Sequence, residues 1–159
     1  MAIETVRTYL KEWNADSRIL EFDVSSATVE LAAQAVGCEP ARIAKTLSFK
    51  IDDSCILIVA AGDAKVDNSK YKAQFHTKAK MPSGDEVTEL VGHAIGGVCP
   101  FGVKPGVKVY LDESLRRFHT VFPAAGSSNS AIELTLEELE QFSGGVWIDV
   151  CKGWETQVE

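Results

Sequence analysis

The stretch LVGHAIGGVCPFG, residues 90–102, concentrates glycine, histidine, cysteine and proline in one short segment. Gly96 and Gly97 permit positive φ angles and a close approach of a ligand to the backbone, and Pro100 stiffens the turn. Successive N–H groups in such a loop can bind an anion or stabilise the oxyanion that forms when a carbonyl is attacked. A plain surface loop is the alternative. The segment is not a phosphate-binding loop, because both GxxxxGK[ST] and GxGxxG are absent.

Lys45 is the second candidate for a chemical role. It lies in ARIAKTLSFKI among apolar neighbours, where a strand is expected to enter a sheet. A lysine at this position either extends along its aliphatic stem from the sheet end into solvent, or points into a pocket and binds a ligand carbonyl or phosphate. The spacing alone favours neither.

Cys99 together with His93 or His119 raises the possibility of nucleophilic catalysis. No local signature of a cysteine hydrolase accompanies them, and a small apolar thiol in a loop is the alternative. The histidines, His76 included, show no metal-ligand spacing, so neither a metal nor another cofactor is expected.

Two further segments carry polar groups. GSSNSAIEL, residues 126–134, places hydroxyls and an amide beside a predicted strand, although a polar hairpin turn explains it equally well. Asp63 and Asp67 in AGDAKVDNSK are candidate catalytic acids, but such residues more often accept hydrogen bonds from turn and helix-cap amides.

The charge of the chain is acidic but uneven. The 159 residues carry a formal net charge of −7, with a pI of about 5.0. A general nucleic-acid binder is not expected, because phosphate contacts need local Lys and Arg. The segment from Lys65 to Lys80 differs, with five lysines against the single acid Asp67. It is either a solvated face or an edge that meets one anionic partner.

The remaining composition narrows the setting. Cys38, Cys55, Cys99 and Cys151 are far apart and form no CxxC pair, which favours a reducing cytoplasm over a disulfide framework or a zinc site. No apolar run reaches the roughly 18 residues of a membrane span. We therefore expect neither a membrane nor DNA as a partner. The first thirteen residues indicate a helix of the mature protein, not a targeting peptide.

Hydrophobic periodicity and capping signals predict the elements that position these residues. Ser26 is expected to cap a helix, and Ser83 with Glu86 and Thr135 with Glu138 to form capping boxes. The expected helices span 3–13, 28–36, 68–75, 84–90, 112–118 and 136–142, and the expected strands span 18–24, 42–51, 54–62, 107–111, 119–125, 131–134 and 146–150. Strands 42–51 and 54–62 should form an antiparallel hairpin. The mixture indicates a single α/β (α+β) domain over residues 1–159, with a mixed, largely antiparallel, barrel-like sheet and surrounding helices.

Four segments in order, AKTLSFKI, LIVAAGDAKVDNSKYK, VGHAIGGVCPFG and GSSNSAIELTLEEL, resemble the YbaK-like family of free-standing aminoacyl-tRNA deacylases. That family is related to the editing domain inserted in bacterial prolyl-tRNA synthetases, and the resemblance covers about residues 20–152. It implies a barrel-like editing domain. It also implies hydrolysis of the ester between a wrong, small amino acid and its tRNA, often a prolyl tRNA. The acceptor end of a mischarged tRNA is then the expected partner, and a synthetase is a candidate second partner.

The resemblance also assigns residues. The expected catalytic residues are Lys45, Gly96, Gly97, Val98 and Cys99. The expected substrate-binding residues are Thr46, His93, Pro100, Gly126, Ser127, Ser128 and Asn129, with Ser130 as a further wall residue. The basic run, and not the resemblance, supplies the expected tRNA contacts Lys65, Lys70, Lys72, Lys78 and Lys80, joined by Arg116 and Arg117.

These residues suggest one mechanism. Loop N–H groups would stabilise the oxyanion, and Lys45 would bind the carbonyl or a terminal phosphate or hydroxyl. The resemblance further implies that the attacking water is held by the loop and by the substrate's own ribose hydroxyl, without a covalent intermediate. A small cavity would exclude the correct, larger amino acid.

The sequence departs from the family pattern at two positions. Cys99 stands where many members carry serine, which argues against a nucleophilic role, and Ala131 stands where some members carry an acid. The second departure suggests selection of a different amino acid. Two other functions stay open: a non-catalytic module of the same fold that binds an aminoacyl group, a nucleotide or a protein, and a cysteine-dependent hydrolase.

Overall fold

The computed structural model describes residues 2–94 and 96–154. Its helices are α1 (Ala2–Leu10), α2 (Val29–Val36), α3 (Asn68–Phe75), α4 (Gly84–Val91) and α5 (Leu136–Ser143), with 3-10 turns η1 (Lys11–Trp13), η2 (Asp16–Arg18), η3 (Pro40–Arg42) and η4 (Glu113–Arg117). Its strands are β1 (Leu20–Glu21), β2 (Ile43–Ile51), β3 (Ser54–Ala61), β4 (Lys65–Val66), β5 (Lys108–Asp112), β6 (Thr120–Pro123), β7 (Ser130–Ala131), β8 (Leu134–Thr135), β9 (Val146–Ile148) and β10 (Cys151–Lys152).

The central sheet is mixed and has the strand order β8-β6-β2-β3-β5-β9. Its two longest strands, β2 and β3, form the predicted antiparallel hairpin, with Lys45 paired to Ala60. The pairs β2–β6, β3–β5 and β5–β9 are parallel, whereas β6–β8 is antiparallel. Two small antiparallel pairs, β1–β7 and β4–β10, lie outside this sheet. The mixed α+β class is confirmed, with more parallel pairing in the central sheet than the sequence indicates.

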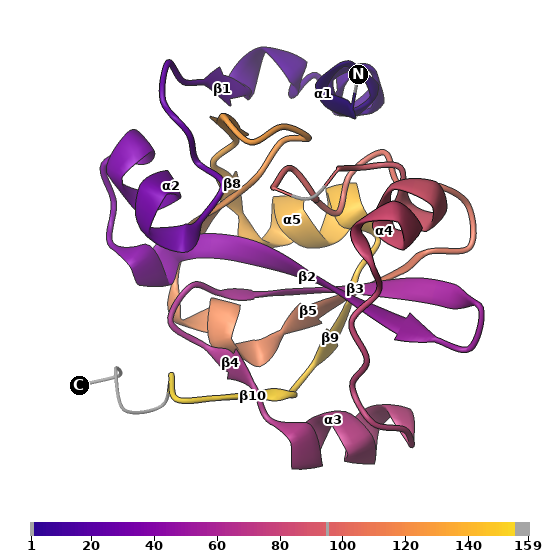
Figure 1. The fold of residues 1–159 in the computed structure, drawn as a ribbon. Helices are drawn as coiled ribbons and strands as arrows, with labels where there is room; N and C mark the ends of the chain where they lie inside the picture. The colour runs from indigo at the N-terminus through magenta and orange to yellow at the C-terminus, as the bar shows by residue number, and fades with distance from the viewer. Residues whose placement is uncertain (1, 95, 155–159) are drawn as a thin grey trace.

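Helices and loops cover the sheet on both sides (Figure 1). α2, α4, α5 and the N-terminal helix α1 lie on one side of β2 and β3, and α3 with the β4–β10 pair lies on the other. β3 is buried from Cys55 to Ala61, which explains why its sequence is a continuous apolar run and does not alternate. Fully buried large side chains such as Leu57, Ile58 and Phe101 form the core.

Local signals fix most of the helix ends. Both predicted capping boxes are present, at Ser83–Glu86 and at Thr135–Glu138. The predicted cap at Ser26 is wrong, because Thr28 accepts the hydrogen bond from the Leu31 N–H and α2 begins at Val29. The predicted strand over 18–24 is also wrong beyond Leu20–Glu21, since β7 offers only two partner residues, Ser130 and Ala131.

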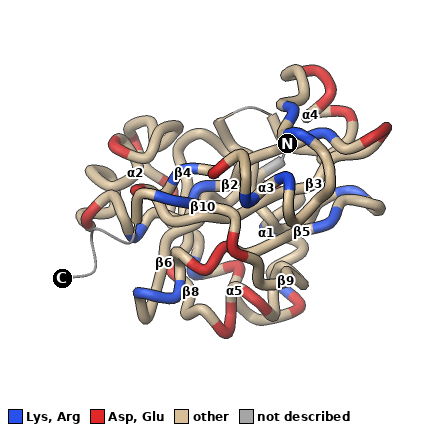
Figure 2. The backbone as a smooth tube through the Cα atoms, turned by 90° about the horizontal axis from the view of Figure 1, so that it is seen from below, with Lys and Arg blue, Asp and Glu red and all other residues tan. Residues whose placement is uncertain are grey.

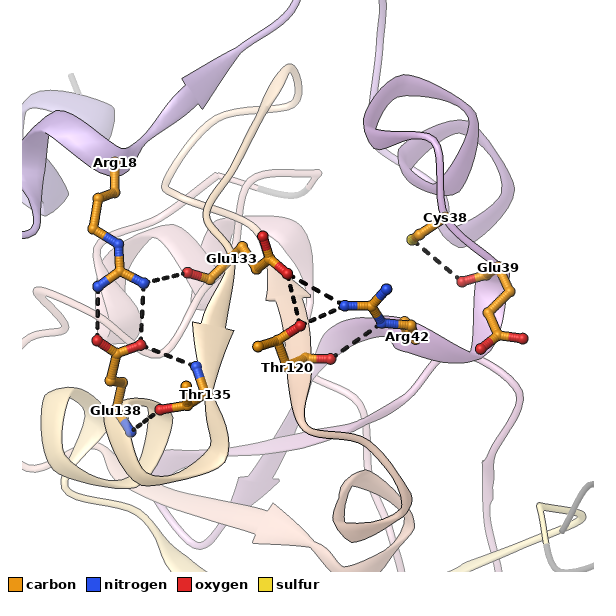
Figure 3. A network of polar contacts seen from close by, with 8 residues as sticks. All are labelled: Arg18, Cys38, Glu39, Arg42, Thr120, Glu133, Thr135 and Glu138. Carbon is orange, nitrogen blue, oxygen red and sulfur yellow. Dashed lines mark hydrogen bonds and ion pairs between the residues drawn. The ribbon is translucent and has the colours of Figure 1, made fainter.

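A polar network ties the 133–138 segment to distant parts of the chain (Figure 3). Arg18 makes a bidentate contact with Glu138, with N–O distances of 2.7 and 3.0 Å, and donates to the Glu133 carbonyl at 2.7 Å. Arg42 lies on the other side of this segment, with one guanidinium nitrogen 3.3 Å from the Glu133 carboxylate. Thr120 donates to the same carboxylate at 2.7 Å. These contacts fasten β8 and the start of α5 to η2 and η3.

Within residues 2–94 and 96–154, no helix combines the length and apolar character required to cross a bilayer.

Candidate functional site

A cavity of about 410 Å³ is lined by residues of β2, of α2 and the segment before it, and of the segment that leads into α4. This volume lies in the range of small-ligand sites. Its wall is mainly apolar and includes one lysine and several serine and threonine residues. The residues that line it are Ser26, Ala27, Thr28, Val29, Ala32, Ile43, Ala44, Lys45, Thr46, Leu47, Ser48, Met81, Pro82, Val87, Gly96, Val98, Phe122, Ala124, Ser130 and Ala131.

Lys45 contributes the cation of this wall. It stands near the start of β2, is partly buried, and donates from Nζ to the carbonyl of Ala64 and, at 3.5 Å, to that of Gly62. Burial lowers the pKa of its ammonium group, because a low-dielectric environment disfavours the charged form. Of the two interpretations of Lys45 in the sequence, its place in the cavity wall favours the pocket.

The glycine loop reaches the cavity through Gly96 and Val98. Gly96 has a φ of +93°, a backbone conformation that residues other than glycine rarely adopt. Gly97 serves a different purpose: a Cβ placed there would lie 2.8 Å from Ser127 Cα and 2.9 Å from Ser127 N. The sequence predicts that a ligand lies close to the backbone at Gly97, but the backbone of Ser127 takes that place. The Gly97 N–H also donates to the Ala94 carbonyl at 3.0 Å, which removes it from the set of oxyanion donors.

His93, Cys99 and Pro100 belong to this loop, are buried, and do not line the cavity. His93 is fully buried, with Nε2 2.9 Å from the Phe101 carbonyl and 3.7 Å from Cys99 Sγ. Burial raises the pKa of the Cys99 thiol to about 12 and lowers the pKa of His93. A catalytic pair needs an accessible thiolate, so this arrangement contradicts the cysteine-hydrolase alternative. The placement also contradicts the expectation that His93 contacts substrate directly.

The predicted substrate-binding turn 126–129 supports the cavity from behind. Its carbonyls at Ser128 and Asn129 accept hydrogen bonds from Ser26 N and Phe22 N, at 2.6 and 2.8 Å. Ser127 Oγ lies 2.7 Å from Ser130 Oγ, and Ser130 is a buried wall residue. Gly126, Ser127, Ser128 and Asn129 are therefore not wall residues, contrary to expectation, whereas Thr46 and Ser130 are.

Two wall residues carry hydroxyls without a protein partner. Ser26 Oγ and Thr46 Oγ1 are buried, and no described residue forms a hydrogen bond with either oxygen. An unpaired buried hydroxyl costs about 1–3 kcal/mol, so its presence in a ligand-sized cavity is consistent with a polar ligand group. Sequence reasoning took Ser26 for a helix cap, and only the tertiary hydrogen bond from Ser26 N to the Ser128 carbonyl, together with its place in the cavity lining, reveals it as a wall residue.

The predicted tRNA lysines do not share one face. Lys70 and Lys72 belong to α3, which Figure 1 shows on the side of the sheet opposite α2 and α4. Lys70 contacts Asp149 and the Cys151 carbonyl, at 3.1 and 2.9 Å. In Figure 2, which views this side, basic segments stand near α3 and β10. Lys78 and Lys80, by contrast, are exposed on the connection that leads directly into Met81 and Pro82 of the cavity wall.

The remaining candidates have structural partners. Asp67 caps α3 by accepting from Ser69 N and Lys70 N, as expected of a helix-cap residue. Asp63 forms an ion pair with Arg117, so Arg117 is not available for the predicted tRNA contact. Across the described ranges, no group of three or more His, Cys, Asp or Glu residues is arranged to hold a metal ion.

The mixed sheet, the mainly apolar cavity against β2 and the glycine loop in its lining are the features to compare with known folds. A solved structure that covers nearly the whole chain shows that the fold is of the editing-domain type. The family model described as the aminoacyl-tRNA editing domain matches residues 24–142. The chain belongs to this family.

Relatives and solved structures agree with this assignment. The chain is 58% identical over 157 residues to the uncharacterized protein YwhH of Bacillus subtilis, covering 98% of this chain and 100% of that protein. It is 27% identical to the proline–tRNA ligase of Halalkalibacterium halodurans, covering 80% of this chain but only 23% of the ligase. A solved structure proposed to be a trans-editing enzyme for prolyl tRNA synthetase aligns with a TM-score of 0.86 and 30% identity, covering 96% of this chain and 98% of that chain.

Proposed function

We propose that this protein is a trans-editing aminoacyl-tRNA deacylase that hydrolyses the ester of a mischarged small amino acid, with prolyl tRNA as the expected carrier. The observation that carries the proposal is the cavity itself, which brings Lys45, the hydroxyl residues Ser26 and Thr46, and the loop residues Gly96 and Val98 around one space. Family membership and the 30% identical trans-editing structure support the same reaction.

Each group has a proposed role. Lys45 binds the ester carbonyl or a hydroxyl of the terminal ribose as a fixed cation. The N–H groups of Gly96 and Val98 stabilise the developing oxyanion, for which one well-placed donor contributes about 3 kcal/mol. Ser26, Thr46 and Ser130 bind polar atoms of the substrate. The attacking water is oriented by the loop and by the substrate's own ribose hydroxyl, without a covalent intermediate.

Selection is proposed to work by exclusion at the apolar part of the cavity wall. Its wall includes Ala32, Ala44 and Ala131 at positions where larger side chains would fill it. A small amino acid enters and the correct, larger one stays outside, which gives a discrimination that a methylene difference alone does not supply.

The exposed Lys78 and Lys80 are the proposed contacts for the acceptor end, because the chain continues from them into the cavity wall. Replacing both by alanine should raise KM. It should also reduce the slope of log affinity for tRNA against log salt concentration by about one per lysine. Lys108→Ala, an exposed lysine on β5, is the matched control. Equal effects of the control and the double variant would contradict this placement.

The decisive experiment is deacylation of prolyl tRNA mischarged with alanyl, cysteinyl, seryl, threonyl and 2-aminobutyryl esters, with the prolyl ester as control. We expect rapid hydrolysis of one or two small esters, loss in Lys45→Ala and retention in Lys108→Ala. Binding of the esters by the wild type without turnover would instead support the non-catalytic module.

A further inference from the structure

Lys45 is held in the cavity wall by a tight turn and not by a carboxylate. Its Nζ donates to the carbonyls of Gly62 and Ala64, which flank Asp63. An ammonium group has three N–H donors, so two bonds to this turn leave one donor for a substrate oxygen. The direction of that third donor is set by where the turn stands.

The side chain between these carbonyls makes a strong contact of its own. Asp63 Oδ2 lies 2.9 Å from one terminal nitrogen of Arg117, and Asp63 Oδ1 lies 2.5 Å from the other. Only 11% of the Arg117 side chain and 20% of the Asp63 side chain are exposed. A bidentate arginine–carboxylate pair in this geometry fixes orientation as well as distance.

Arg117 is itself immobilised, so it can serve as an anchor. Its Nε donates to the Ser114 carbonyl at 2.9 Å, and its guanidinium carbon lies 4.8 Å from the Phe118 ring and 5.3 Å from the Trp154 ring. Ser114 also reaches the same turn, because its Oγ accepts from the Ala61 N–H at 3.1 Å. Residues of the 3-10 turn η4 thus form hydrogen bonds with the chain at Ala61 and at Asp63.

The turn is also closely packed at Gly62. A Cβ on Gly62 would lie 2.0 Å from the Pro40 carbonyl oxygen and 2.7 Å from a methyl carbon of Val29. The turn is therefore packed between η3 and α2 on one side and the Arg117 anchor on the other. Close packing transmits a small displacement at one side directly to the other.

We infer that Asp63 and Arg117 are positioning residues of the site: their ion pair sets the Gly62–Ala64 turn, whose carbonyls aim the Lys45 ammonium into the cavity. The inference rests on the proposed function for its kinetic consequence. Neither residue contacts the substrate. Loss of the pair should lower kcat by roughly 10- to 100-fold, the effect of a displacement of about 1 Å at a reacting centre, and leave KM nearly unchanged.

The test compares Asp63→Asn and Arg117→Lys with the wild type, at a temperature where circular dichroism shows every variant folded. Arg117→Lys retains the charge but lacks the planar fork, so it should not restore kcat. The double variant Asp63→Asn/Arg117→Lys should be no slower than the worse single variant, because both changes break one contact. The control is Arg18→Gln, which breaks a bidentate pair of the same kind with Glu138 away from the turn.

A second readout separates this inference from the proposed function. The Cε resonance of Lys45 in ¹³C-lysine-labelled protein, assigned by its absence in Lys45→Ala, should shift in Asp63→Asn and stay in place in Arg18→Gln. A wild-type protein that hydrolyses no ester overturns the proposed function, and the resonance still tests the anchor. Wild-type kcat and an unshifted Lys45 resonance in Asp63→Asn would overturn the inference, as would an equal loss of kcat in Arg18→Gln.

Discussion

Replacing Gly97 by alanine should disrupt the site through the backbone alone. The added Cβ would lie 2.8 Å from Ser127 Cα, 2.9 Å from Ser127 N and 3.0 Å from Gly126 C. Real Cβ atoms do not approach backbone atoms this closely, and neither partner is a flexible side chain that could turn away. The glycine loop and the 126–129 turn must therefore separate.

The cost follows from the kind of contact. Forcing an extra carbon into a packed interior costs about 1–3 kcal/mol, and rigid backbone partners place Gly97→Ala in the upper part, about 2–3 kcal/mol. For a chain of this size each kcal/mol lowers Tm by about 2–4 °C, so a decrease of roughly 4–12 °C is expected. Because the 126–129 turn supports Ser130 and the segment of Ser26, deacylation should fall as well.

The assay is denaturant unfolding combined with ¹H–¹⁵N spectra and deacylation rates. Gly106→Ala is the control, since Gly106 has a φ of +92° and nothing within 4 Å of an added Cβ. That variant should show the cost of a left-handed alanine, about 1–2 kcal/mol, without moving the amide signals of residues 127–130. Gly97→Ala with a free energy of unfolding within about 0.5 kcal/mol of wild type, and with unmoved signals at 127–130, would refute the reasoning.

Three further predictions rest on single groups. Thr46→Val removes a buried hydroxyl without a protein partner, so Tm should stay the same or rise while deacylation falls, and a decrease in Tm would show that the hydroxyl has a partner. Iodoacetamide at pH 8 should modify the partly exposed Cys38 in the native protein, but Cys99 only after unfolding, because burial raises the pKa of Cys99 to about 12. Peptide mass spectrometry measures which cysteine is modified. The hydrogen bond from Arg18 lowers the pKa of Glu138 to about 2, below its ordinary value, so the stabilisation is complete above about pH 5 and is lost as the pH falls toward 2. The difference in unfolding free energy between wild type and Arg18→Met should therefore shrink over this interval, and a constant difference would contradict the assignment.

The sequence predicts well the features that depend on neighbours along the chain. The capping boxes at Ser83 and Thr135 and the β2–β3 hairpin depend on residues a few positions apart, and all are present. The ordered motifs also predicted that Lys45 and Gly96 would share one site, and both line the same cavity. The roles of these residues remain proposals.

Features that depend on tertiary pairing were missed. Asp63 and Arg117 are 54 positions apart, and no periodic pattern links them. The lysines of the 65–80 segment are close in sequence, but the chain passes from one side of the sheet to the other between α3 and α4, which charge counting does not reveal. The short strands β4 and β10 consist of two residues each, too few for a hydrophobic alternation.

The composition of the cavity wall limits the chemistry that the site can perform. Among the described residues that line it, Lys45 is the one titratable side chain, and His93 and Cys99 are buried away from the cavity. A wall without histidine, carboxylate or thiol leaves Lys45 as its sole candidate general base, and Lys45 Nζ already donates hydrogen bonds to two main-chain carbonyls. An ester substrate does not require one, because its carbonyl is already electrophilic and its own ribose supplies a hydroxyl beside the reacting carbon. Under the proposed function, catalysis by this wall comes from orientation and from donors directed at the developing oxyanion. The inferred anchoring of Lys45 through Asp63 and Arg117, and a loop shaped by glycine, fit that mode of catalysis.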